Sequence, residues 1–285
     1  MGRSIRLLEE GKYRLRLLVE GYPLPLVNSV RRACFTEVPV MAIDIVEFIE
    51  NNTVLYDEII AHRLGLIPLT SEEALSRYDP PEKCRDAPLE DTRCYAVLTL
   101  EVHTTKTEPQ RIVYSGDLQP EDPDVRPVYP NIPIVVMAQQ QRLRLQAYAR
   151  LGYGKEHAKW IPVTVAAHKY LPVLSFDLGK PGAEECVRCI EQAYPSIAEK
   201  MREMGKGSIE VVDDVNTSAL YWCVNKKCGE AASLNYMQDR LILTIETTGS
   251  LTARRVLLKA VEAVEAKAKK LLEEVEALKT GNEQG

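Results

Sequence analysis

Seven cysteines are the side chains of this sequence best suited to chemistry, and four of them form two close pairs. They are Cys186 and Cys189, separated by two residues, and Cys223 and Cys228, separated by four. Thiolates at such spacing can hold one zinc ion or an iron–sulfur cluster from two loops. The gaps match neither a zinc ribbon nor a bacterial ferredoxin, and disulfides or free buried thiols are the alternatives. The spacing leaves all of these states open.

The other three cysteines and the four histidines have simpler interpretations. Cys84 and Cys94 flank a polar loop and could pair with each other, but the sequence leaves their state open. Cys34 lies on the apolar stripe of an expected helix, so it is interpreted as a core residue. The histidines are scattered without the spacing of metal ligands, and a histidine-based metal centre is therefore not expected.

The segment GYGKEHAKW, residues 152–160, has some features of a phosphate loop or a catalytic pair. A Walker loop needs four residues between its glycines and a Ser or Thr after its lysine. Here Gly152 and Gly154 are one residue apart, and Glu156 follows the lysine. His157 could act as a general base, but the sequence supplies no nucleophile arrangement such as a serine elbow. We expect a structural turn or a docking loop.

Charge and hydropathy define the class of protein. The formal net charge of −5 argues against a free-standing nucleic-acid-binding protein, which usually has a basic face. Arg142, Arg144 and Arg150 alternate with apolar residues, so we expect them on the solvated face of a strand. No apolar run approaches the roughly 20 residues that cross a bilayer, and the charged start lacks a secretory signal. We expect a cytoplasmic protein that does not enter a membrane.

The elements that position these groups follow from periodicity. Residues 13–20 alternate as a half-buried strand with its arginines outward, and a helix over 25–37 precedes a second strand over 40–48. A short helix begins near Asp57. From about Ser71 the pattern predicts a mainly antiparallel middle domain, with a helix over about 196–204 and a further strand at 241–245.

A long helix is predicted from about Leu251 to Lys279, and its apolar residues recur in steps of four and three. They are Leu257, Val261, Val264, Ala268, Leu271, Val275 and Leu278. This is the period of a helix that packs along another helix. Packing on the chain's own sheet is the alternative interpretation. One helix on three strands makes a thin core, however, which a partner helix would complete.

Five blocks, in order along the chain, resemble one known family. They are Asn28–Leu69, YSGDL at 114–118, PVYPNIPIV at 127–135, GYGKEHAKW at 152–160 and ETTGSL at 246–251. Together they resemble the alpha-type assembly subunits of RNA polymerases, and specifically the alpha-like subunit of the archaeal DNA-directed enzyme. That archaeal family is similar to bacterial alpha, in its N-terminal domain, and to the third-largest subunit of eukaryotic RNA polymerase II.

The resemblance implies an α+β fold with a discontinuous alpha/L-type dimerisation domain at residues 1–53 and 236–285. A mainly antiparallel β domain at 54–235 would be inserted into it, with a degenerate ferredoxin-like insert at 179–232. The implied function is non-catalytic: the chain pairs with the small subunit L and forms the platform for the large catalytic subunits of a DNA-directed RNA polymerase, a nucleotidyltransferase. No residue of this chain would be catalytic.

The resemblance also implies partner surfaces. Subunit L would pack on Val30, Arg31, Arg32, Glu37, Leu257, Val261, Val264, Ala268, Leu271 and Val275. The middle domain would contact the second-largest subunit and small zinc-binding subunits, with residues 57–69 and 152–160 as docking candidates. DNA and RNA would be reached only indirectly, through the complex.

In some family members the insert holds an iron–sulfur cluster on a run of cysteines. Here Gln192 and Ser196 stand where further cysteines would be expected. A [3Fe-4S] or [4Fe-4S] cluster, or zinc, on Cys186, Cys189, Cys223 and Cys228 therefore stands beside the disulfide alternative.

Overall fold

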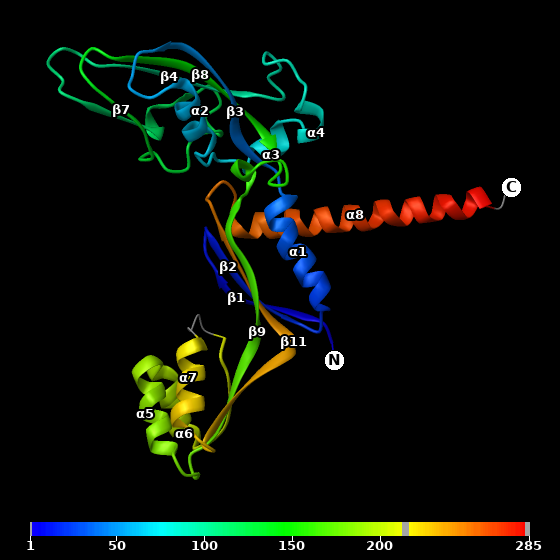
Figure 1. Cartoon of the computed structure of the whole chain (residues 1–285). Helices are drawn as coiled ribbons and strands as arrows, with labels where there is room; N and C mark the ends of the chain where they lie inside the picture. Colours follow the sequence, from blue (N-terminus) through cyan, green and yellow to red (C-terminus); the bar gives the residue numbers. More distant parts are fainter. Residues whose placement is uncertain (1, 213–216, 283–285) are drawn as a thin grey trace. The chain divides into compact units, whose positions relative to one another are not determined.

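The computed structural model describes residues 2–212 and 217–282, with side chains described up to residue 277 (Figure 1). The chain forms two compact units, each built from segments that are far apart in the sequence. The first contains Met1–Glu10, Arg16–Val27 and Ala167–Thr244, and the second contains Gly11–Leu15, Asn28–Ala166 and Ile245–Gly285. Among the described helices, none is both long enough and apolar enough to cross a bilayer.

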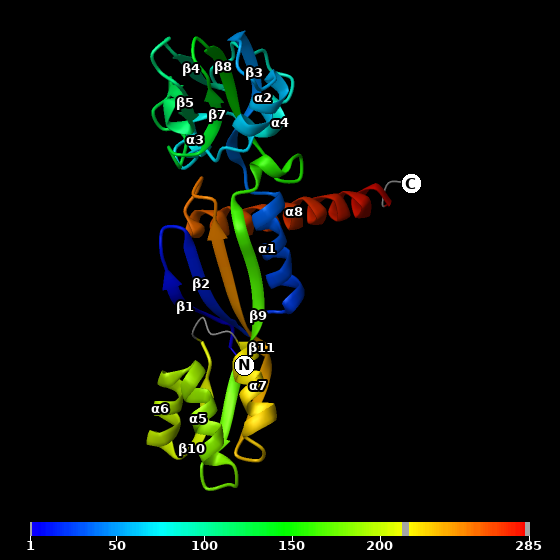
Figure 2. The same cartoon turned by 60° about the vertical axis from the view of Figure 1, so that its left-hand side comes forward.

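One five-stranded sheet contains strands from both ends of the sequence (Figure 2). Its order is β1 (Ser4–Glu10), β2 (Arg14–Glu20), β11 (Ala232–Thr247), β9 (Val163–Asp177) and β10 (Lys206–Glu210). β2 from the start of the chain and β11 from its last quarter are hydrogen-bonded neighbours. The pairing of β2 with β11 in one sheet is what a dimerisation domain formed by both chain ends requires.

β2 is more deeply buried than its alternating sequence predicts. Leu15, Leu17, Leu18 and Val19 are all buried, and so is Arg16, which is only 5% exposed. The expectation of an outward Arg16 is therefore wrong. Its Nη2 donates a hydrogen bond to the Val212 carbonyl oxygen at 2.6 Å, and its Nη1 lies 3.6 Å from Glu9 Oε2. These contacts engage both terminal nitrogens of the buried guanidinium, which offsets much of the cost of covering this strand on both faces, while the buried Nε has no hydrogen-bond partner among the described residues.

Three helices follow β9 in the first unit: α5 (Ala183–Ala193), α6 (Pro195–Met204) and α7 (Thr217–Lys227). Ile190, Met201 and Leu220, one from each helix, are fully buried in a core shared with Leu174 and Phe176 of β9. α6 confirms the helix predicted over about 196–204. α5 and α7 were not predicted, although Cys186, Val187 and Ile190 recur at helical spacing on one face of α5.

The second unit is built around a four-stranded antiparallel sheet of order β3-β8-β4-β6. These strands are β3 (Val40–Asn51), β4 (Ala96–His103), β6 (Gln119–Pro120) and β8 (Arg142–Gly152). β5 (Arg111–Tyr114) and β7 (Pro133–Met137) form a separate antiparallel pair. The short helices are α2 (Asp57–Gly65), α3 (Ala74–Arg77) and α4 (Pro81–Cys84), with turns η1 (Ser115–Asp117) and η2 (Ala158–Trp160). The predicted mainly antiparallel middle domain is confirmed.

β3 belongs to this inserted sheet and not to the sheet formed by the chain ends. It pairs with β8 from Val40 opposite Gly152 to Asn51 opposite Leu143. Met41 and Ile43 are buried in the same core as Leu145 of β8. The expected boundary at residue 53 placed this strand with the dimerisation module. Residues 40–43 of this run are buried, and Val46 and Phe48 pack against the core of the middle domain, so the inserted sheet begins at Val40.

Two helices frame the expected pairing surface: α1 (Leu24–Thr36) and α8 (Ala253–Asn282). α1 ends just before Val38-Pro39, as the proline predicts. α8 begins two residues later than expected, because Thr252 precedes it as a cap: its Oγ1 accepts a hydrogen bond from the Arg255 backbone N–H at 3.3 Å.

Candidate functional site

α8 carries two different apolar faces. Ala253, Val256 and Ala260 are fully buried within the chain. The predicted heptad positions differ: Leu257 and Val264 are half-buried, and Val261, Ala268, Leu271 and Val275 are exposed, Leu271 by 62%. At about 100° per residue, the buried face lies roughly a quarter turn from the heptad stripe. The helix therefore packs on its own chain with one face and leaves the heptad stripe uncovered, and a partner helix on that stripe stays a prediction.

The uncovered apolar surface is wider than the heptad positions alone. Leu258 and Leu272 are both exposed and lie to the same side of the stripe, where Val261 is also exposed. Their signal in the sequence is a second leucine directly after Leu257 and after Leu271. The side chain of Leu278, the last predicted stripe position, lies outside the described residues.

The predicted interface residues of α1 differ in their burial. Ala33 and Cys34 are buried, Val30 is half-buried, and Arg32 is exposed. Arg31 is engaged within the chain: its Nε donates to Asn28 Oδ1 at 2.9 Å and its Nη1 to the Ala166 carbonyl at 3.3 Å. Of the two adjacent arginines, Arg32 is thus the one whose side chain is presented to solvent.

Glu37 ties three segments of the second unit together. Its Oε1 accepts from Lys267 Nζ of α8 at 2.6 Å, and its Oε2 accepts from Lys155 Nζ at 3.2 Å. Burial alone would raise the pKa of Glu37, but the hydrogen bonds from Lys267 and Lys155 outweigh it and hold that pKa below its usual value. Glu37 was predicted as a partner contact, and here it fixes α8 against its own chain.

The GYGKEHAKW block is a packed turn. A Cβ on Gly154 would lie 1.9 Å from the Phe35 carbonyl oxygen, and one on Gly152 would lie 2.3 Å from the Trp160 ring. His157 Nδ1 accepts a hydrogen bond from the Lys159 backbone N–H at 3.0 Å. The glycines therefore serve close packing, and the histidine caps η2. These contacts favour the structural turn that the sequence indicated over a phosphate loop.

A buried ion-pair network anchors that turn to β3 and β8. Arg150, only 7% exposed, donates its Nε to Asp44 Oδ2 at 2.7 Å and lies 4.5 Å over the Trp160 ring. Lys159 Nζ donates to Asp44 Oδ1 at 2.5 Å. Burial would raise the pKa of Asp44, but Lys159 and Arg150 outweigh it, so the pKa lies below its ordinary value. The prediction of a solvated Arg150 is wrong, whereas Arg142 and Arg144 are exposed as expected.

The four paired cysteines form two disulfides, Cys186–Cys228 and Cys189–Cys223. They join α5 to Cys223 in the middle of α7 and to Cys228 just after it, and sulfurs bonded in this way cannot serve as thiolate ligands. Within residues 2–212 and 217–282, no group of three or more His, Cys, Asp or Glu side chains is arranged to hold a metal ion. The donor set in this structure thus does not fit the zinc or iron–sulfur site predicted for Cys186, Cys189, Cys223 and Cys228, and it has the disulfide alternative instead.

The remaining cysteines comprise one further disulfide, which the sequence left open, and the core residue that was predicted at Cys34. Cys84 and Cys94 are joined in a disulfide. Cys34 is a free, fully buried thiol, and burial raises its pKa to about 12. It is therefore a neutral core side chain.

The segment around α2 exposes apolar side chains although its other face is packed. Ile60 and Leu64 are fully buried in the core of the second unit. Tyr56 is 77% exposed, and Val54, Ile59 and Leu66 are also exposed. Exposed apolar groups gathered in one short segment are typical of a protein–protein contact. This makes the predicted docking segment 57–69, extended to Val54, a candidate surface.

Comparison with known proteins defines the class first. Residues 43–173 match the RNA polymerase Rpb3/RpoA insert domain, and residues 131–268 match the RNA polymerase Rpb3/Rpb11 dimerisation domain. The insert match begins inside β3, in agreement with the place of that strand in the inserted sheet. The chain is thus built from the two domains of an alpha-type RNA polymerase subunit.

Relatives then identify the family. The chain is 38% identical to the DNA-directed RNA polymerase subunit Rpo3 of Aeropyrum pernix over 97% of its own length and 96% of the relative's. It is 38% identical to Rpo3 of Methanothermobacter thermautotrophicus over 94% of its length and 97% of the relative's. For Rpo3 of Thermococcus kodakarensis the identity is 34%, over 96% and 98%. The chain therefore belongs to the Rpo3 family of DNA-directed RNA polymerase subunits.

Proposed function

We propose that this chain is the assembly subunit of an archaeal DNA-directed RNA polymerase and that it pairs with the small subunit L. The observation that carries the proposal is the uncovered apolar stripe of α8. From Val261 to Val275 the stripe residues are exposed or half-buried within the chain. Fully burying one such side chain contributes about 1.5–3 kcal/mol, so a partner helix along the stripe would gain several of these increments.

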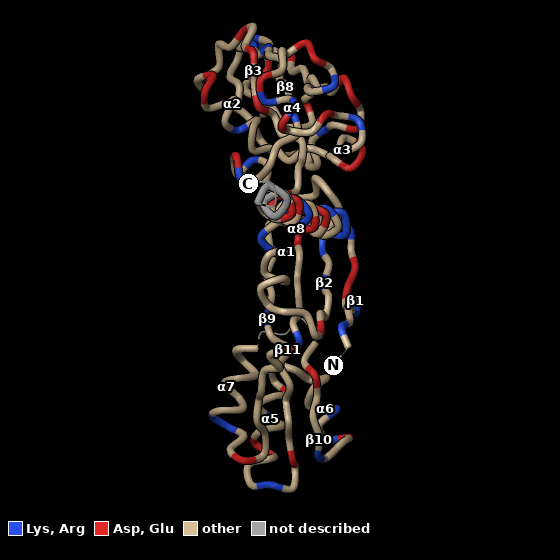
Figure 3. The backbone as a smooth tube through the Cα atoms, turned by 90° about the vertical axis from the view of Figure 1, so that its right-hand side faces the viewer, with Lys and Arg blue, Asp and Glu red and all other residues tan. Residues whose placement is uncertain are grey.

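The residues beside this stripe are polar, which favours a specific choice of partner. Lysines and glutamates occupy much of the remaining solvent-facing surface of α8, where Figure 3 shows both charges along the helix. Charged residues beside an apolar seam select partner and orientation more than they add affinity. The exposed Arg32 of α1 would act in the same way, and Val30 would lie at the edge of the contact.

The inserted domain would carry the platform function. We assign the surface of residues 54–69 and the outer side of the GYGKEHAKW turn to contacts with the second-largest subunit and with small zinc-binding subunits. Exposed Tyr56 and Val54 supply the apolar anchor that such contacts need. Catalysis of nucleotidyl transfer belongs to other subunits, and DNA and RNA would be reached through the assembled enzyme, in the cytoplasm.

Reconstitution tests this role. Purified polymerase subunits are mixed with and without this chain, and assembly is followed by gel filtration and RNA synthesis on a tailed DNA template. We expect the large subunits to remain unassembled, with at least tenfold less RNA synthesis, when the chain is left out. Full assembly and activity without the chain would refute the assembly role.

A further inference from the structure

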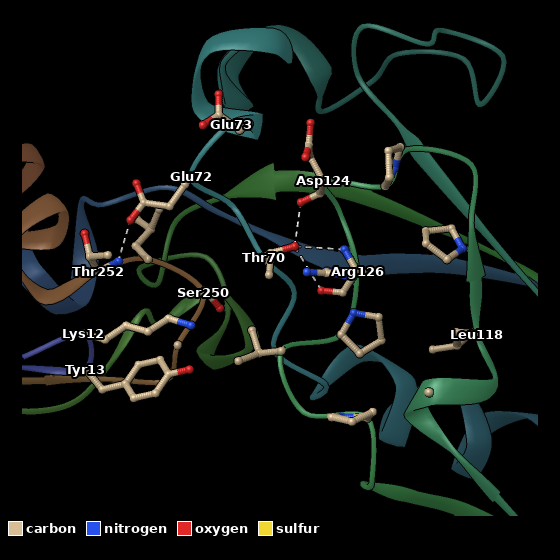
Figure 4. Close-up of a pocket in the computed structure, with 18 residues that line it drawn as sticks. Lys12, Tyr13, Thr70, Glu72, Glu73, Leu118, Asp124, Arg126, Ser250 and Thr252 are labelled. Carbon is tan, nitrogen blue, oxygen red and sulfur yellow. Dashed lines mark hydrogen bonds between the residues drawn. The ribbon is translucent and has the colours of Figure 1, made fainter.

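A cavity of about 740 Å³ lies in the second unit, between the loop before α8 and the loops of the inserted domain (Figure 4). Three of the five blocks that carry the family resemblance contribute to its wall: Tyr114–Leu118, Pro127–Val135 and Glu246–Leu251. The proposed pairing through α8 and α1 uses none of these blocks. Pairing through α8 and α1 therefore does not explain why these three blocks line one cavity.

Hydrogen bonds hold the cavity wall in place without any ligand. Ser71 donates its backbone N–H to the Ser250 carbonyl at 2.9 Å, and Gly116 donates to the Pro130 carbonyl at 2.8 Å. The Thr252 N–H donates to Glu72 Oε1 at 2.7 Å, a contact visible in Figure 4. Segments far apart in sequence are thus fixed around a preformed space, which reduces the ordering cost of binding.

Gly249 is needed for the shape of this wall. Its φ is +95°, a backbone conformation that residues other than glycine rarely adopt. A Cβ here would also lie 2.6 Å from Val128 Cγ1 and 3.2 Å from Tyr13 Cε1. The glycine of the ETTGSL block therefore lets the loop before α8 approach the Val128 loop closely.

The wall is apolar, with charges around it. The apolar side chains are Leu118, Pro120, Pro123, Pro127, Val128, Pro130 and Leu251, with the ring of Tyr13. Two of the carboxylates in the wall form ion pairs with arginines of this chain. Asp124 pairs with Arg77 at 2.7 Å, and Glu72 lies 3.8 Å from Arg255 besides accepting from Thr252.

The remaining charges of the wall are positive in sum. Lys12, Arg126 and Glu73 line the cavity, and none of them has an oppositely charged group within 4 Å in the described part of the chain. Lys12 and Arg126 together exceed Glu73 by one positive charge. An acidic group on a ligand would balance this charge. A phosphate backbone would face the carboxylates of Glu72, Glu73 and Asp124, and only one aromatic ring is present for base stacking. The composition favours a protein segment with an acidic residue.

We infer that this cavity binds a segment of a neighbouring polymerase subunit. The segment would place an aliphatic or aromatic side chain among the proline rings and an Asp or Glu carboxylate beside Lys12 or Arg126. This inference rests on the proposed function, because the occupant comes from the assembled enzyme. It adds a contact site away from the α8 stripe.

Site-specific photo-cross-linking in the reconstituted polymerase tests the inference. Glu73, exposed at the cavity, is replaced by p-benzoylphenylalanine, and a second protein carries the same group at Lys106, which is exposed and does not line the cavity. We expect the Glu73 position, and not the Lys106 position, to cross-link one other subunit. The cross-linked peptide should contain an apolar residue next to Asp or Glu.

Charge reversal gives the matched control. Lys12→Glu with Arg126→Glu should reduce the cross-link yield at least tenfold, while Lys106→Glu with Lys226→Glu leaves it unchanged. Pairing with L should persist in all proteins. Three results with an assembled enzyme would overturn this inference alone. They are no cross-link at Glu73, a cross-link to nucleic acid, and a cross-link yield that does not change on charge reversal. Loss of pairing with L in the unmodified chain overturns the proposed function, and this inference with it.

Discussion

Lys267, in the middle of α8, donates a 2.6 Å hydrogen bond to Glu37, one residue past the end of α1. Glu37 also accepts from Lys155 in the GYGKEHAKW turn, so one carboxylate joins three segments. The contact lies two turns beyond Ala260, the last fully buried residue of α8. It therefore helps to set the direction in which the exposed stripe projects.

Replacing this carboxylate should loosen α8. Glu37→Gln removes two ion pairs, with Lys267 and Lys155, that are partly shielded on the Glu37 side, and we expect a loss of about 0.5–1 kcal/mol in unfolding free energy. We also expect faster amide hydrogen exchange over residues 263–277 and a several-fold weaker affinity for L. The matched control is Glu265→Gln, whose carboxylate, within the described residues, pairs along α8 with Lys269. Equal exchange rates in the two variants would show that Glu37 does not hold the helix.

The centre of the heptad stripe should matter most for pairing. Val264→Asp together with Leu271→Asp would place two charges in an apolar contact, and we expect the affinity for L to fall at least about 100-fold, or 2.7 kcal/mol. Circular dichroism should stay unchanged, because Leu271 is exposed and Val264 only half-buried within the chain.

A control for this pair lies on the opposite side of the same helix. Ala266→Asp with Glu273→Asp adds aspartates about half a turn away from the stripe. These changes should leave binding within twofold in a pull-down or calorimetric titration. If both double variants bind L equally well, the interface lies elsewhere.

The two disulfides of the first unit should stabilise it measurably. Cys186–Cys228 closes a sequence separation of 42 and Cys189–Cys223 one of 34, for which chain entropy predicts about 3–4 kcal/mol each. A reductant should therefore lower the midpoint of thermal unfolding, while a variant with these four cysteines changed to serine should respond much less, because Cys84–Cys94 is the disulfide left to reduce. Iron and acid-labile sulfide analysis after anaerobic purification decides the alternative: a brown, iron-containing protein would support a cluster.

Asp44 gives a pH-dependent prediction. Because its pKa is lowered in the folded protein, the stabilisation by Arg150 and Lys159 is present above the ordinary value of 3.8 and is lost as the pH falls through the lower folded value. Asp44→Asn should cost about 3 kcal/mol at neutral pH, since Arg150 keeps a buried charge. In urea unfolding this difference should shrink below about pH 4. Asp86→Asn, at an exposed position, should have little effect at any pH, and a pH-independent loss for Asp44→Asn would contradict the ion-pair account.

Periodicity predicted most of the second unit correctly, for a physical reason. Leu98, Leu100 and Val102 of β4 are buried while their neighbours are not, because one face of this sheet meets the core. The prediction failed for β3 and β2. An apolar run shows that a strand is buried, but not which sheet it joins, and Arg16 is buried by contacts with residues distant in sequence.

The candidate surface was predicted only in outline. The repeat in α8 indicated a partner, but the buried face of Val256 and Ala260 could not be separated from the stripe without the fold. Arg150 and Glu37 appeared as surface charges because their partners are more than 100 residues away in the sequence. The cysteine spacing allowed several chemistries, and only the proximity of α5 and α7 distinguishes the disulfide arrangement.

The most direct test of the central claim is the stoichiometry and affinity of this chain with subunit L, measured by sedimentation velocity and titration calorimetry. We predict that the chain alone self-associates or aggregates through its exposed α8 stripe and that co-expressed L converts it into a soluble one-to-one heterodimer. A well-behaved monomer with no affinity for L would contradict the account.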